Sequence, residues 1–144
     1  MLYYSDEKDI LNLKDKDVAV IIPLSCDGLA DYPLAKRFFE KYPNMKLIYT
    51  DDCNLKSLDI GHCTVQNSIY GIFIFFPVRI NSNDDGNYSE VNKTIDSLLA
   101  ILDYFPDLKV AIPKIGMEKD RSLIVESLYN KTKDYKNDLF LVGW

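Results

Sequence analysis

The sequence predicts an α/β protein, a three-layer α/β/α sandwich with a mixed, mostly parallel central sheet. Short apolar runs rich in β-branched and aromatic residues recur along the chain, and this pattern is typical of strands buried on both faces. Segments with an apolar residue every three to four positions alternate with these runs, as expected for helices that pack on a sheet. The length of 144 residues suits a single domain, residues 1–144, and no linker, repeat or low-complexity tract divides it.

The first half of the chain supplies strands around one helix. A buried strand is predicted over residues 17–24 (DVAVIIPL), followed by a helix over 34–42. Pro33 opens this helix, where its missing N–H would be unpaired in any case. The pattern then predicts a short strand over 45–50 (MKLIYT), a further short strand near 64–66, and the most apolar strand over 69–77 (IYGIFIFFP).

The second half alternates helices and strands. Ser89 is the expected cap of a helix that runs to about Tyr104, because apolar residues recur with a 3.6-residue period at Val91, Ile95, Leu98, Leu99 and Leu102. A strand is then predicted over 108–113, a helix over 121–133 and a closing strand over 139–142.

Charge and apolar patterning exclude several classes of protein. The net charge is −5, with 22 acidic against 17 basic residues, which argues against a general nucleic-acid binder. One small phosphate site remains compatible with it, because backbone N–H groups bind phosphate without any cation. The longest apolar stretch is far shorter than the ~20 residues of a membrane-spanning helix. No secretory signal is recognisable at the amino terminus, so we expect no membrane association and a cytoplasmic location.

The cysteines and the one histidine do not form a metal-binding pattern. Cys26, Cys53 and Cys63 are widely spaced, and His62 has no second histidine to join it. We therefore expect neither a zinc site nor a resident cofactor, and we interpret the three cysteines as reduced, partly buried thiols.

Two strand-to-helix loops are the natural places for a ligand, because ligands of open α/β sheets bind beyond the carboxyl ends of strands. The first loop is residues 25–32 (SCDGLADY) and the second is residues 114–120 (KIGMEKD). Each leads into a helix amino terminus with unpaired N–H groups and a partial positive charge. Together they predict a site for a diphosphate.

Three segments carry a resemblance to a known family. Residues 20–28 (VIIPLSCDG), residues 30–43 with their KRFFEKYP end, and residues 110–116 (VAIPKIG) are similar to the macro domain. The nearest likeness is to a small branch with bacterial and phage members and the terminal ADP-ribose glycohydrolases. The residues LDIG at 58–61 also resemble a mid-domain turn of the family. The resemblance spans nearly the whole chain, and residues 111–116 are its most specific part.

The resemblance implies a site for ADP-ribose or a related nucleotide. Asp9 and Ile10 would contact the adenine. Ser25 and Cys26, followed by Asp27 and Gly28, would lie beside the distal ribose. Ile115 and Gly116, followed by Met117, would lie against the diphosphate. Asp120 stands where the glycohydrolases have their catalytic acid, and Arg79 stands near the position of a lysine that they use.

Several positions depart from the family. Asp31, Tyr32 and Pro33 replace glycines at the first phosphate turn, and Glu118 replaces the second glycine of the second turn. Because carboxylates repel phosphate and Pro33 lacks a donor, these changes predict weakened diphosphate binding. Arginine stays protonated, so Arg79 cannot replace a nucleophilic lysine. The alternative function is therefore a macro-fold interaction module with a protein partner and no nucleotide.

Individual residues also have structural interpretations. Asp120 precedes a predicted helix and is suited to cap it. Asp9 and Ile10 fit equally well as a surface acid followed by a core aliphatic residue. Cys26 fits as a small buried side chain at least as well as it fits as a reactive thiol.

Overall fold

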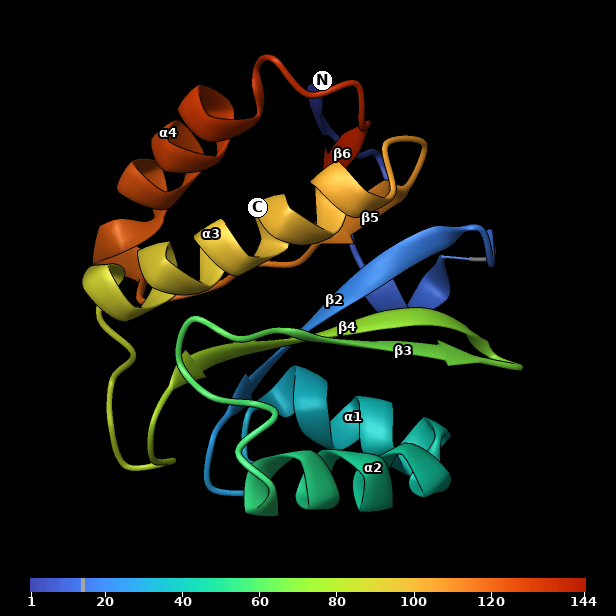
Figure 1. Ribbon diagram of the computed structural model, residues 1–144, viewed down its shortest axis with the longest axis vertical. Coiled ribbons are helices and arrows are strands. Elements are labelled where there is room, and N and C mark those ends of the chain that lie inside the picture. The colour runs from blue at the N-terminus through green and yellow to red at the C-terminus, as the bar shows by residue number, and fades with distance from the viewer. Residues whose placement is uncertain (14) are drawn as a thin grey trace.

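A computed structural model describes residues 1–13 and 15–144, and in it two pairs of helices enclose one six-stranded sheet (Figure 1). The strand order is β1-β6-β5-β2-β4-β3, and the neighbouring pairs are parallel except β3 and β4. The strands are β1 (Leu2–Tyr4), β2 (Val18–Ser25), β3 (Thr64–Ser68), β4 (Gly71–Arg79), β5 (Lys109–Ile112) and β6 (Leu139–Leu141). The predicted fold class, a mixed and mostly parallel sheet in an α/β/α sandwich, is confirmed.

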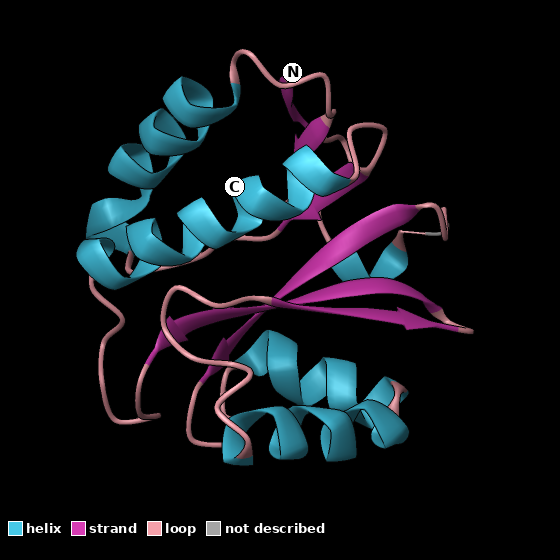
Figure 2. Cartoon of the chain, viewed as in Figure 1, coloured by secondary structure: helices cyan, strands magenta, loops and turns pink. Residues whose placement is uncertain are grey.

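The helices cover the sheet in pairs, one pair on each face (Figure 2). One face carries α1 (Pro33–Lys41) and α2 (Pro43–Asn54), and the other carries α3 (Tyr88–Tyr104) and α4 (Arg121–Thr132). Two short 3-10 helices, η1 (Ile10–Asn12) and η2 (Glu118–Asp120), lie in the connections. No helix in the described ranges is both long enough and apolar enough to span a membrane.

Each face of the sheet has its own apolar core because both faces of the central strands are buried. Under α1 and α2 the core is aromatic: the Phe38 ring packs edge-on against Phe73, with centroids 4.8 Å apart, and Phe39 stacks on Tyr49 at 5.3 Å. Under α3 and α4 the core is aliphatic, formed by residues such as Ile95, Leu98 and Ile124. The continuous apolar run of β2 is explained by this double burial.

The prediction of a strand over residues 45–50 is wrong, because these residues belong to α2. The β-branched and aromatic side chains of this stretch suggested a strand, but burial follows the helical period at Met45, Tyr49 and Cys53. Leu47, between them, is 69% exposed. Pro43, expected to end the preceding helix, instead begins α2, since proline is tolerated in a first helical turn.

Other differences concern boundaries and short elements. Asn87, not Ser89, caps α3, and its side chain accepts a hydrogen bond from the Glu90 N–H. Ile69 and Tyr70 lie in the turn between β3 and β4 rather than in a strand. No sequence pattern predicted β1, a three-residue strand at the sheet edge beside β6.

The carboxyl ends of β2, β4 and β5 meet at one edge of the sheet because these three strands are parallel neighbours. The two predicted loops leave this edge, residues 26–32 between β2 and α1 and residues 113–117 between β5 and η2. A third loop, residues 80–87 between β4 and α3, joins them there. The candidate site is built from these loops and the segment around η1.

Candidate functional site

A hollow of ≈ 330 Å³ lies at the end of the sheet edge nearest η1. The hollow is lined by parts of four segments that are distant in sequence. They are the segment before and within η1 (Lys8, Asp9, Ile10), α1 (Leu34, Arg37), the residues after β5 (Pro113, Lys114) and the residues after β6 (Val142, Gly143). The fold therefore brings the predicted adenine contacts, Asp9 and Ile10, beside α1 and the start of the second strand-to-helix loop.

Asp9 is held in place by its own segment and by α1. Its Oδ1 accepts a hydrogen bond of 3.1 Å from the Leu11 N–H and so caps η1, and its Oδ2 is paired with the Arg37 guanidinium. The hydrogen bond and charge of Arg37 are the main reason that the pKa of Asp9 lies below its usual value. Among the described residues nothing accepts a hydrogen bond from the Ile10 N–H. The Asp9 carboxylate, which already pairs with Arg37 and Leu11, and the unpaired N–H of Ile10 thus stand side by side at the hollow.

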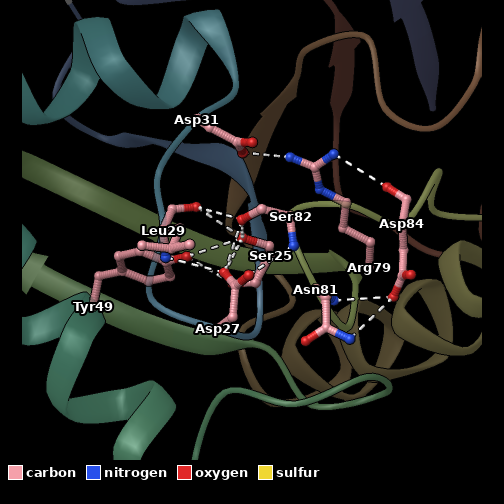
Figure 3. A network of polar contacts seen from close by, with 9 residues as sticks. All are labelled: Ser25, Asp27, Leu29, Asp31, Tyr49, Arg79, Asn81, Ser82 and Asp84. Carbon is pink, nitrogen blue, oxygen red and sulfur yellow. Dashed lines mark hydrogen bonds and ion pairs between the residues drawn. The ribbon is translucent and has the colours of Figure 1, made fainter.

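The first loop is fastened by Asp27 (Figure 3). The Asp27 carboxylate accepts hydrogen bonds from the Leu29 N–H at 3.0 Å and from the Ser82 N–H at 2.7 Å, with the hydroxyls of Ser25 and Ser82 at 2.8 and 3.0 Å. Burial alone would raise the pKa of Asp27, but these hydrogen bonds outweigh burial and lower it to about 2. Since Ser82 lies in the β4–α3 loop, Asp27 ties the two loops together.

The polar groups of Ser25 and Cys26 are also engaged in contacts within and between these loops. Ser25 is 1% exposed, and the Tyr49 hydroxyl donates to its carbonyl oxygen at 2.7 Å. The Cys26 N–H donates to the carbonyl oxygens of Arg79 and Ile80 at 3.0 and 3.1 Å. Burial, with smaller contributions from nearby acidic groups, raises the pKa of the Cys26 thiol to about 12. Cys26 is therefore a protonated thiol at neutral pH rather than a nucleophile.

Arg79 reaches from the end of β4 to the first loop. Its guanidinium lies 4.1 Å from the centre of the Tyr32 ring, and its Nη2 is 2.5 Å from the Asp31 carboxylate. Its Nη1 donates to the Asp84 carbonyl oxygen at 3.2 Å. The carboxylate of Asp31, expected to repel phosphate, is thus neutralised by a neighbouring cation.

The second loop has a different character. The Ile115 side chain is 2% exposed in the aliphatic core, so only its backbone is available to a ligand. Gly116 has a φ of +76°, and a Cβ there would meet the Ile124 Cδ1 at 2.5 Å, so this turn requires glycine. No described residue accepts a hydrogen bond from the N–H groups of Gly116, Met117 or Glu118.

Asp120 begins α4 without capping it. Its carboxylate makes no hydrogen bond or ion pair with the residues that the structure describes, although its N–H donates to the Met117 carbonyl oxygen at 2.9 Å. The cap interpretation of Asp120 therefore lacks the side-chain hydrogen bond that would support it.

The structure divides the predicted residues into groups. Asp9 and Ile10 line the hollow, whereas Ser25, Asp27 and Arg79 belong to the network between the first and third loops. Gly28, at a φ of +80°, turns the first loop, and a Cβ there would meet nothing within 4 Å. Sequence reasoning missed Arg37 and Ser82, because nothing in their local pattern shows which loop each faces.

Within residues 1–13 and 15–144 no group of three or more His, Cys, Asp or Glu is arranged to hold a metal ion.

Comparison by sequence finds no matching family model and no matching curated protein. Comparison by structure finds close similarities. The macrodomain of Thermus aquaticus DarG gives a TM-score of 0.85 at 13% identity, covering 99% of this chain and 97% of that one. The macrodomain of Mycobacterium tuberculosis DarG gives 0.79 at 18% identity, covering 97% of each chain. Thermosipho africanus DarTG in complex with ADP-ribose gives 0.72 at 13% identity, covering 88% of this chain and 39% of that one.

These similarities show the fold: the chain has the fold of a macrodomain over nearly its whole length. The resemblance inferred from the segments at residues 20–28, 30–43 and 110–116 is thereby confirmed at the level of the fold. Its nearest branch stays a prediction, and so do the roles of the individual site residues.

Proposed function

We propose that this protein binds ADP-ribose or a related adenine nucleotide with a diphosphate. The observation that supports the proposal most directly is the pairing of an acceptor and a donor at the hollow. The Asp9 carboxylate and the Ile10 N–H match the amino group and ring nitrogen on one edge of adenine. The neighbouring structure of Thermosipho africanus DarTG, which holds ADP-ribose, supports the same ligand class.

The loops support a diphosphate next to the base. The N–H groups of Gly116, Met117 and Glu118 have no acceptor among the described residues, and unpaired N–H groups before a helix favour an anion. On the other side, Arg79 pairs with Asp31, so this carboxylate is not an isolated negative charge beside the loops. We therefore favour nucleotide binding over a module that has lost its ligand.

For hydrolysis, Asp120 is the residue we propose to activate water or to orient the ribose. Its carboxylate has no partner in the described part of the chain, which suits a general base. An arginine side chain is not a nucleophile, so we infer no covalent step through this position.

Calorimetric titration with ADP-ribose tests the binding proposal. We expect one site per chain, and even a dissociation constant of ~100 μM would give roughly 2.7 kcal/mol of thermal stabilisation at 10 mM ligand. Asp9→Asn keeps an oxygen for the Leu11 N–H but loses the charge and an acceptor for adenine, so binding should weaken about tenfold.

The matched control is Asp107→Asn, which makes the same charge change at an exposed aspartate in the α3–β5 loop and should leave affinity unchanged. Absence of both heat and stabilisation at 10 mM ADP-ribose would rule out the proposed function. Equal affinity of the wild type and Asp9→Asn would remove Asp9 from the base contact.

A further inference from the structure

The Arg79 guanidinium is a largely buried cation with N–H groups that no described residue accepts from. Its side chain is 12% exposed, lies against the Tyr32 ring and donates from Nη1 to the Asp84 carbonyl oxygen. Its Nε is buried and has no hydrogen-bond partner within the described chain. Stacking and the carbonyl contact fix the plane of the guanidinium, so its remaining N–H groups are oriented before any ligand arrives.

The partner of this cation is held much less firmly. The Asp31 side chain is 46% exposed, and the Arg79 Nη2 is its only partner among the described residues. Ion pairs with an exposed partner contribute little stability, because water solvates the separated charge well. The Asp31 carboxylate can therefore leave the guanidinium and enter solvent at small cost.

The two side chains also lie on different loops of the site. Asp31 belongs to the first loop, where the resemblance to the macro domain implies a phosphate turn, and Arg79 ends β4. A carboxylate and a phosphate offer an arginine similar oxygen pairs, and arginine binds both in two-pronged fashion. In the absence of ligand, Asp31 fills the place that an anionic group would take on Arg79.

We propose that Arg79 is an anion-binding residue of the site and that Asp31 is its internal competitor, which a ligand phosphate displaces. This inference rests on the proposed function for the identity of the full ligand, since it assigns one phosphate of the nucleotide to Arg79. It predicts that the wild-type protein binds phosphate-bearing ligands more weakly than a protein in which no carboxylate pairs with Arg79. The departure at Asp31 is then a regulator of affinity rather than a loss of the site.

The experiment compares variants with three probes: ADP-ribose, inorganic diphosphate and adenosine, which has no phosphate. Asp31→Asn removes the competing charge and leaves the packing of Arg79 on Tyr32 in place. We expect it to bind ADP-ribose and diphosphate about tenfold more tightly than the wild type and adenosine equally. In an Arg79→Gln background the same substitution should give no gain in affinity, because Asp31 then has no guanidinium to occupy in competition with a phosphate.

The matched control is Asp85→Asn, an exposed aspartate of the third loop whose charge also acts on Tyr32 but which has no bond to Arg79. An equal gain from Asp85→Asn, or a gain from Asp31→Asn that persists in Arg79→Gln, would show a general charge effect and overturn the proposal. Unchanged or weaker binding by Asp31→Asn would overturn it as well. Melting temperatures of all variants establish that each is folded, and Arg79→Met, which removes the charge and keeps an aliphatic chain against Tyr32, serves if Arg79→Gln unfolds.

The outcome separates this inference from the proposed function. If Asp31→Asn gains affinity for diphosphate while neither protein binds adenosine or ADP-ribose, the anion site is supported and the nucleotide proposal fails. If the wild type binds ADP-ribose and Asp31→Asn changes nothing, the nucleotide proposal stands and the competitor role is wrong. If no variant binds any probe, both fail.

Discussion

Asp27 and Asp120 stand in the two strand-to-helix loops of the same sheet edge, yet their surroundings are opposite. The Asp27 carboxylate is surrounded by four hydrogen-bond donors from its own loop and from the β4–α3 loop. The Asp120 carboxylate has no partner among the described residues, although it directly precedes a helix of 12 residues. The Asp27 carboxylate holds the two loops together, and the Asp120 carboxylate is free to contact a ligand or a water molecule.

This contrast separates structural from chemical roles at one site. A carboxylate whose oxygens already accept several hydrogen bonds gains little from a ligand, because each new contact would replace an existing one. A partly exposed carboxylate with no partner keeps its full capacity as an acceptor or base. We therefore assign Asp27 to the architecture of the first loop and keep Asp120 as the candidate for chemistry.

The largest effect that we expect is on stability, from Asp27→Ala. Removing this carboxylate leaves the N–H groups of Leu29 and Ser82 without their acceptor and separates the first loop from the third. Hydrogen bonds to charged groups contribute about 1.5–3 kcal/mol, so we expect a loss of about 2 kcal/mol in the free energy of unfolding. Urea denaturation measures it, and a loss below ~0.5 kcal/mol would contradict the structural role.

The sequence predicted the sheet and its loops but not how the loops are joined. Double burial of β2 and β4 leaves a clear apolar signature, and the period of α3 is equally clear, because both depend on neighbours along the chain. The bonds from Asp27 to Ser82 and from Asp31 to Arg79 depend on the meeting of loops about fifty residues apart, and no local pattern encodes that meeting. For this reason the sequence showed Asp31 only as a negative charge at a predicted phosphate turn and did not show its ion pair with Arg79.

The misassigned residues 45–50 give a complementary lesson. Their apolar and β-branched content is high, but Leu47 and Ile48 are exposed on the side of the helix that faces solvent. Short apolar runs do not distinguish a strand from a helix, and the deciding information is the burial of Met45, Tyr49 and Cys53 one turn apart against the aromatic core.

A smaller effect should appear in the acid range with Asp27→Asn. The folded pKa of Asp27 is about 2, below its ordinary value of 3.8, so its contribution to stability is present above pH ~4 and lost as the pH falls toward 2. The asparagine cannot take up a proton in this window. Between pH 4 and 2, the unfolding free energy of Asp27→Asn should therefore fall less steeply than that of the wild type. Urea titrations across this range measure the slopes, and parallel curves would show that the lowered pKa does not stabilise the fold.

The smallest effect on the free energy of unfolding should come from Asp120→Ala. The same variant should have a larger effect on the rate of ADP-ribose release. With no capping bond to lose, the variant should unfold within ~0.5 kcal/mol of the wild type. Any release of ADP-ribose from a modified acidic side chain that the wild type catalyses should fall about 100-fold, the lower end of what general acid–base catalysis supplies. Asp120→Asn should lose release to the same extent, since an amide cannot accept the proton. Equal rates of release in the wild type and both variants would remove Asp120 from the mechanism. If Asp120→Ala lost as much unfolding free energy as Asp27→Ala, the two loops would not differ as their hydrogen bonds indicate.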